Sequence, residues 1–140
     1  MQLKRTLPLL TMALLLFCSF APAPAIKHIK PLGICDFAFE NNTVYTVADG
    51  IFYTSKDKLV YSNVLPGTGS GGTIIEFDDA GDTFTYYITF ATTPTTPTVV
   101  HVYFGINIIT EVIPAGVTSF RTTIPGPLPY SGIVVTLDPK

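Results

Sequence analysis

Residues 83–104 read TFTYYITFATTPTTPTVVHVYF, and this stretch decides the fold. Its first nine residues alternate, so that Phe84, Tyr86, Ile88 and Phe90 share one face and mainly polar residues occupy the other. Its last seven residues, 98–104, are β-branched or aromatic and apolar on both faces, as in a strand buried in the middle of a structure. The Thr/Pro segment between them is expected to be an exposed loop. We therefore predict two central β-strands.

The rest of the chain continues this pattern. Short apolar runs with turn residues between them recur after residue 33, and no window has the three-and-four spacing of a helix. Asn41-Asn42 and Asp49-Gly50 are predicted to be hairpin turns, and residues 65–72 a flexible crossover between two sheets. Further strands are expected at 34–40, 43–48, 51–55, 59–63, 73–77, 117–124 and 132–138, and 106–112 is expected to continue the run of 98–104 past a bulge or bend at Gly105.

About eight or nine antiparallel strands without a helix predict a single all-β domain. Two sheets packed face to face would let each strand bury one side, which favours a β-sandwich. A closed β-barrel is the alternative.

Residues Ile113–Ser119 read IPAGVTS. This segment resembles a turn of bacterial immunoglobulin-like and Calx-β-like sandwich modules, where such a sequence joins two late strands. The resemblance covers seven residues. It implies an immunoglobulin-like sandwich and an interaction or structural role rather than catalysis.

The first 25 residues have the three parts of a secretory signal peptide. Lys4 and Arg5 provide the positive start, residues 9–20 an apolar run, and residues 21–25 the small residues of a cleavage site. Cleavage after Ala25 places alanine at the positions one and three residues before the cut. The sequence thus predicts secretion to the extracellular space or the periplasm.

The processed chain is expected to consist of an extended lead-in at residues 26–33 and one domain at 34–140. A lipid anchor on Cys18 is disfavoured, because Phe17 is bulky where a small residue is needed. Without Cys18, Cys35 has no partner for an internal disulfide. We expect Cys35 to be a small buried hydrophobic residue, with a bond to a partner chain as the alternative.

Charge excludes one class of partner. The formal net charge is −2 and becomes more negative once Lys4 and Arg5 are removed. Nucleic-acid binding requires clustered lysine and arginine, which this chain lacks in sequence. No apolar segment after the leader is long enough for a transmembrane helix.

Few residues suggest chemistry. Asp78, Asp79 and Asp82 form an acidic turn and a weak calcium candidate, for which an ordinary hairpin turn is the simpler explanation. No other metal site and no cofactor is predicted.

A hydrolase built on His101 would require a nucleophile and a carboxylate, for which Ser119, Ser131 and Asp138 are available. No local motif supports such a set. We therefore expect a protein that is not an enzyme.

The tyrosines are the strongest binding candidates. They cannot all be core residues, and exposed tyrosines on a sheet would stack on sugar rings or anchor a protein. Ordinary cross-strand packing is the alternative explanation. A second functional hypothesis is a structural subunit that pairs through an edge strand or the arm at residues 26–33. The candidate binding residues are Tyr45, Tyr53, Tyr61, Tyr87 and Tyr103.

Overall fold

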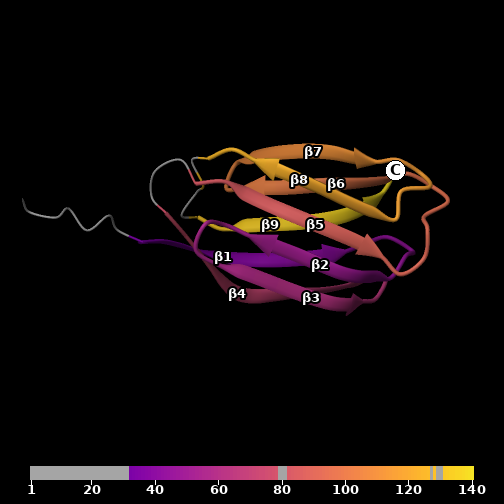
Figure 1. Ribbon diagram of the computed structural model, residues 1–140, viewed down its shortest axis with the longest axis horizontal. Helices are drawn as coiled ribbons and strands as arrows, with labels where there is room; N and C mark the ends of the chain where they lie inside the picture. Colours follow the sequence, from indigo (N-terminus) through magenta and orange to yellow (C-terminus); the bar gives the residue numbers. More distant parts are fainter. Residues whose placement is uncertain (1–31, 79–81, 127, 129–130) are drawn as a thin grey trace, which may run out of the picture.

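A computed structural model describes residues 32–78, 82–126, 128 and 131–140. These residues form nine β-strands and no helix, and none of them belongs to a helical segment able to cross a membrane (Figure 1). The strands are β1 (Leu32–Asn41), β2 (Val47–Tyr53), β3 (Lys58–Val64), β4 (Thr68–Asp78), β5 (Phe84–Phe90), β6 (Thr98–Phe104), β7 (Asn107–Ile113), β8 (Ser119–Ile124) and β9 (Ile133–Pro139).

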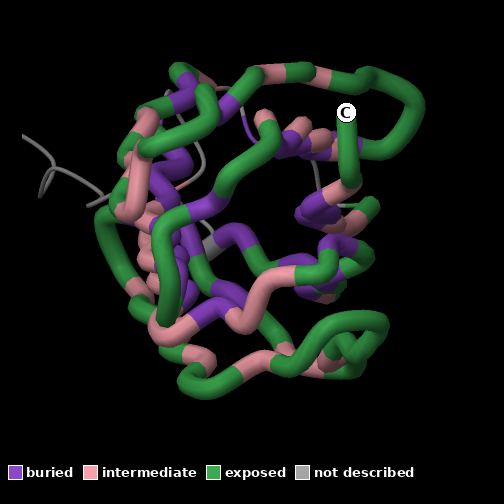
Figure 2. The backbone as a smooth tube through the Cα atoms, turned by 90° about the vertical axis from the view of Figure 1, so that its right-hand side faces the viewer, coloured by how far each residue is buried: buried purple, intermediate pink, exposed green. Residues whose placement is uncertain are grey.

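The strands form two sheets, one of order β4-β1-β9-β6-β7 and one of order β3-β2-β5-β8. Each sheet ends in two edge strands, so the predicted β-sandwich is confirmed and a closed barrel is excluded. The inner faces of both sheets carry the buried residues, as the end-on view in Figure 2 shows. Aromatic rings fill much of this core, with the ring centroids of Phe37 and Phe52 4.8 Å apart across it.

Residues 83–104 contain β5 and β6, as predicted. Alternation in β5 buries its apolar side chains, and β6 lies between β9 and β7 inside its sheet. The two strands belong to different sheets, because the Thr/Pro loop at 92–97 carries the chain across the sandwich. The loop lies at the same end of the molecule as the last residues of β1.

The hairpin predicted at Asn41-Asn42 is wrong, because β1 and β2 lie in different sheets. Asn41 is fully buried, and its side-chain amide donates to the carbonyl oxygens of Tyr45 at 2.8 Å and Val64 at 3.1 Å. Its side-chain oxygen accepts from the Thr43 hydroxyl at 2.7 Å. Asparagine therefore stabilises the crossover between layers rather than a tight turn.

The hairpin predicted at Asp49-Gly50 is also wrong, since both residues lie inside β2. A Cβ atom on Gly50 would lie 3.1 Å from a ring carbon of Phe39 and 3.2 Å from one of Phe52. Glycine thus lets two core rings approach the backbone of the strand. The strand predicted at 43–48 is mostly wrong, because residues 42–46 form the loop between β1 and β2. Only its last two residues are strand, and they continue through Asp49-Gly50 into the predicted strand 51–55, with an irregularity between Val47 and Asp49.

Residues 65–72 do carry the chain between the sheets, as predicted, but only their first part is a connection. Thr68, Gly69 and Ser70 already pair with β1 as the start of β4. The register shifts between Phe37 and Phe39, opposite Gly72, whose φ of 78° suits glycine. At the other end of β1, Leu32 and Gly33 belong to the strand, whereas the rest of the predicted lead-in lies outside the described residues.

One pair departs from the predicted antiparallel arrangement. β9 pairs in parallel with β1, from Phe37 opposite Ile133 to Asn41 opposite Leu137. On its other side β9 pairs antiparallel with β6. The first and last strands of the described domain are thus neighbours in the middle of one sheet.

Candidate functional site

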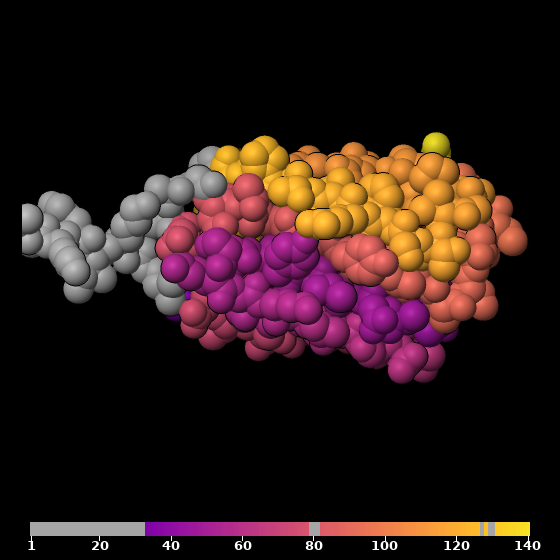
Figure 3. Space-filling view, in the orientation of Figure 1, coloured from indigo at the N-terminus to yellow at the C-terminus, as the bar shows by residue number. Residues whose placement is uncertain are grey.

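The outer face of the β3-β2-β5-β8 sheet carries cross-strand rows of side chains. In one row Val60, Ile51, Tyr87 and Arg121 are successive partners. In the next row Lys58 is opposite Tyr53, which is opposite Thr85 on its other side. We call Ile51, Tyr53, Lys58, Tyr87 and Arg121 the tyrosine face. The space-filling view in Figure 3 shows β2, β3, β5 and β8 side by side on this side of the molecule.

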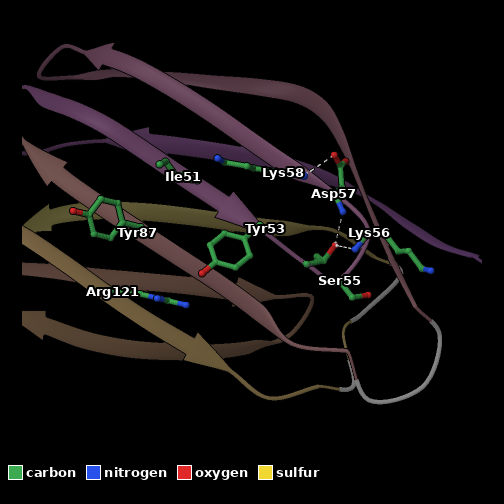
Figure 4. Close-up of a pocket in the computed structure, with 9 residues that line it drawn as sticks. Ile51, Tyr53, Ser55, Lys56, Asp57, Lys58, Tyr87 and Arg121 are labelled. Atoms are coloured by element: carbon green, nitrogen blue, oxygen red, sulfur yellow. Dashed lines mark hydrogen bonds between the residues drawn. The ribbon is translucent and has the colours of Figure 1, made fainter.

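An open depression of about 800 Å³ lies over the tyrosine face and the β2–β3 turn, residues 54–57. Figure 4 shows Tyr53, Tyr87 and Arg121 on the same side of the sheet, with Arg121 extending toward Tyr53. The guanidinium carbon of Arg121 is 5.9 Å from the centre of the Tyr53 ring. This distance permits a cation–π contact that holds both side chains in place.

The environment of Tyr87 favours its ionised form. The hydroxyls of Ser119 and then Thr89 lower the pKa of Tyr87, against smaller opposing effects of burial and Asp49. These same hydroxyls contact each other at 3.4 Å. Polar groups therefore line the face next to the Tyr87 ring.

The β2–β3 turn beside the depression is held by side-chain hydrogen bonds. The Thr54 hydroxyl oxygen accepts from the backbone N–H groups of Lys56 and Asp57, both at 3.1 Å, and donates to the Glu76 carbonyl. The Asp57 carboxylate accepts from the Lys58 N–H at 2.7 Å. A turn fixed in this way gives the depression a rigid end.

Asp82 joins this turn to the start of β5. Its carboxylate accepts from the Ser55 hydroxyl at 2.8 Å, the Asp78 N–H at 2.9 Å and the Thr83 N–H at 2.7 Å. Burial raises the pKa of Asp82, but these donors outweigh burial and hold it below its usual value.

These contacts bear on the calcium candidate. Asp82 is engaged with backbone donors, Asp78 lies 3.6 Å from the Lys56 amine, and Asp79 lies outside the described residues. Among the residues that the structure describes, no three His, Cys, Asp or Glu side chains gather in a way that could hold a metal ion. The two described carboxylates of the acidic turn are therefore engaged with protein donors, Asp82 in hydrogen bonds and Asp78 in an ion pair.

Of the five candidate tyrosines, the structure brings only Tyr53 and Tyr87 together. Tyr45 lies in the β1–β2 loop, where its hydroxyl contacts the hydroxyls of Thr95 and Thr96 at 3.0 Å each. The ring of Tyr61 faces the core, 6.0 Å from that of Phe37. Tyr103 lies on β6, in the other sheet.

Sequence reasoning does not identify the other members of the tyrosine face. Ile51 falls in the predicted strand 51–55, whereas Lys58 falls between that strand and the next, at 59–63. Arg121 falls in a predicted strand, but nothing in the sequence shows that β8 lies beside β5 in the sheet. The alternation around Arg121 places it on a polar face, and this is the one signal that the sequence contains.

Of the groups proposed for a hydrolase, the structure brings together His101 and Asp138 but neither serine. His101 lies on the outer face of the other sheet, with its Nδ1 3.0 Å from the Thr110 hydroxyl and its Nε2 3.9 Å from Asp138. Ser119 belongs to β8, across the sandwich, and Ser131 lies next to Gly105 at the far end of β6. In the described structure the hydroxyl next to His101 therefore belongs to Thr110, and no candidate serine contacts it.

Cys35 is a free thiol, only 4% exposed, on the inner face of β1. Burial, and then the neighbouring Asp36 carboxylate, raise the pKa of Cys35 to about 11. The interpretation of Cys35 as a buried hydrophobic residue is confirmed, and a bond to a partner chain would require the domain to open.

Compared with known proteins, the chain matches no family model and no curated protein sequence.

Proposed function

We propose that this chain is an exported, non-enzymatic binding module that contacts a protein or glycan partner through the tyrosine face. The observation that carries this proposal is the pair of tyrosine rings on adjacent strands, beside an open depression and an arginine. Tyrosine and arginine dominate the energetics of binding surfaces. Tyrosine adds a large contact area at the cost of only two side-chain torsions, and arginine adds charge and several hydrogen-bond donors.

Rigidity supports the same function. The rings stand on two interior strands of their sheet, and the β2–β3 turn is fixed by Thr54 and Asp57. A surface already in its binding geometry loses little entropy when a partner arrives.

Export rests on the leader at residues 1–25. If it is a signal peptide, the mature protein begins at Ile26, and mass spectrometry of protein secreted by a bacterial host should give that mass. Protein retained in the cell at full length would contradict export.

Arrays of purified glycans and extracellular proteins test the binding role. We expect ligands of the native protein to be lost with Tyr53→Ala and Tyr87→Ala. Tyr103→Ala is the matched control, because Tyr103 lies on the outer face of the opposite sheet. If Tyr103→Ala loses binding to the same extent, or if the Tyr53 and Tyr87 variants retain binding, the tyrosine face is not the binding surface.

A second candidate is a structural subunit that assembles through β4. This strand is 11 residues long, lies at a sheet edge and begins with a glycine-rich segment whose outer backbone is unpaired within the described sheet. Edges of this kind template pairing with another chain. Light scattering should show that the particle size of the protein increases with its concentration, and Ile74→Lys on β4 should abolish this increase. A native protein that remains a monomer at every concentration would contradict this candidate.

A further inference from the structure

The tyrosine face carries a concentration of positive charge that the composition does not predict. The chain has a formal net charge of −2. Nevertheless, three of the four lysine and arginine residues in the described part of the chain line the same depression. They are Lys56, Lys58 and Arg121.

Two of these three cations have no acidic partner among the described residues, although the Arg121 guanidinium also contacts the Tyr53 ring. Lys56 lies 3.6 Å from the Asp78 carboxylate and extends away from the two tyrosine rings in Figure 4. Within the described residues neither Lys58 nor Arg121 forms a salt bridge. Asp57, the acidic residue of the lining, already accepts hydrogen bonds from the N–H groups of Lys58 and Glu76.

These two cations flank the aromatic rings. Lys58 is on β3 and Arg121 on β8, the two edge strands of the sheet, and the rings stand on β2 and β5 between them. Three strand spacings of about 4.8 Å, or about 14 Å in all, separate the backbone of β3 from that of β8. The face between the two edge strands is therefore wider than a single sugar ring and offers room for a ligand of several units.

Exposed or half-buried hydroxyl groups lie beside the rings on the same face. Thr85, the partner of Tyr53 on β5, is itself buried, but its hydroxyl contacts that of the exposed Thr123 on β8 at 2.9 Å. Thr89 and Ser119 occupy the row on the other side of Tyr87. The hydroxyls of Thr123, Thr89 and Ser119 can each donate and accept a hydrogen bond, which suits a ligand covered with hydroxyl groups.

We propose that the ligand of the tyrosine face is an acidic oligosaccharide, with carboxylate or sulfate groups on separate sugar units. The apolar faces of its sugar rings stack on Tyr53 and Tyr87, and its anionic groups pair with Lys58 and Arg121. This inference rests on the proposed binding role of the same face. An acidic peptide would use the same cations, but the hydroxyl groups beside the two tyrosine rings favour the saccharide.

Calorimetric titration tests the proposal with matched probes. The first probe is an oligogalacturonate of four to six units, and the second is its methyl ester, which keeps the backbone but loses the charge. A sulfated oligosaccharide of the same length distinguishes sulfate from carboxylate. We expect either acidic saccharide to bind about tenfold more tightly than the ester, with an affinity that falls as salt rises.

Charge variants locate the contact. Lys58→Gln and Arg121→Gln should each weaken binding of the acidic probe by about two- to fivefold, as expected for exposed ion pairs. Lys140→Gln is the control, since Lys140 lies outside the face and should change nothing. Both Lys58 and Arg121 are exposed, so the variants keep the fold, which thermal melts verify.

The outcomes separate the two levels of the proposal. Equal affinity for the acid and its ester, with binding still lost in Tyr53→Ala, overturns the acidic ligand but leaves the binding face. Equal binding of polyglutamate of matched charge overturns the saccharide in favour of an acidic peptide. Saccharide binding that survives both tyrosine variants overturns the proposed function itself.

Discussion

Tyr86 and Tyr61 both point into the core, and their hydroxyl groups differ in what they contact. The Tyr86 hydroxyl donates to the Glu111 carboxylate at 2.7 Å, and the Thr122 hydroxyl donates to the same carboxylate at 3.3 Å. Burial, and then Glu111, raise the pKa of Tyr86 well above its usual value. The Tyr61 hydroxyl is buried without a hydrogen-bond partner among the described residues.

The two tyrosines should therefore respond in opposite ways to removal of the hydroxyl. Tyr86→Phe leaves a half-buried carboxylate short of a donor and should cost about 1–3 kcal/mol of unfolding free energy. Tyr61→Phe removes an unpaired polar group and should be neutral or stabilise by up to about 1 kcal/mol. Urea denaturation of both variants measures the difference, and comparable destabilisation by the two would contradict it.

Which tyrosines face outward could be predicted from sequence only in part. Alternation correctly separated Tyr86 from Tyr87 within one strand. Tyr53 and Tyr61 are eight residues apart, yet they face opposite sides, because Tyr53 pairs with Lys58 and Tyr61 with Gly50 across the β2–β3 turn. Which face of the sheet each tyrosine occupies depends on the pairing register of the hairpin, and the spacing of eight residues does not reveal that register.

At the scale of elements, the Thr/Pro loop between β5 and β6 is attached to the β1–β2 loop through one side chain. Besides its contacts with the hydroxyls of Thr95 and Thr96, the Tyr45 oxygen accepts from their backbone N–H groups at 3.0 and 3.1 Å. The hydroxyls of Thr95 and then Thr96 lower the pKa of Tyr45 to about 8. Several donors thus converge on an oxygen that can become negative.

Stability should depend on pH through this contact. The folded pKa of Tyr45 is about 8, below the value of about 10 for an unfolded chain, so ionisation favours the folded state. The stabilisation is present above the unfolded pKa and is lost as pH falls through about 8. The difference in unfolding free energy between the native protein and Tyr45→Phe should therefore widen from pH 7 to pH 10. A difference that does not change with pH would show that Tyr45 does not ionise in this setting.

The elements themselves were largely predictable, and the errors have a common physical cause. The strands around Phe84 and Val100 followed from alternation and β-branching. Asp49-Gly50 has the composition of a hairpin turn, but it lies inside a strand because two phenylalanine rings require a residue without a side chain at Gly50. Contacts between residues distant in sequence thus override the local preference of Asp-Gly for a turn.

At the scale of the whole molecule, β9 is the central strand of the larger sheet and joins its two halves. It pairs with β1 on one side and β6 on the other, and its inward side chains Ile133, Val135 and Leu137 are fully buried. Burial of three such side chains contributes about 1.5–3 kcal/mol each. This sum approaches the total stability of a domain, about 5–15 kcal/mol.

Removal of residues 133–140 should therefore abolish folding, although it takes away only the last strand. We expect no cooperative urea transition and no strand signal of native strength in circular dichroism. Deletion of Lys140 alone is the control and should preserve both. A cooperative transition in the longer deletion would show that the remaining eight strands form a domain by themselves.

Strand order could not be predicted, because alternation tells which way a side chain faces but not which strand lies beside it. The parallel contact of β1 and β9 joins residues about a hundred positions apart, and no local signal marks it. The tyrosine face depends on the same kind of information, since Arg121 reaches Tyr53 only through the order β2-β5-β8.

The parallel alignment of β1 and β9 also gives the domain two distinct poles. Leu32 is the partner of Asp78, close to the β2–β3 turn, whereas the N–H of Lys140 donates to Pro97 in the Thr/Pro loop at the opposite end (Figure 1). A bead or surface attached at the C-terminal pole would leave the depression pointing outward and accessible. Attachment through a short tether at the other pole would place the surface close to the depression and hinder access of the ligand. The orientation of the immobilised protein should therefore decide whether it binds the ligand.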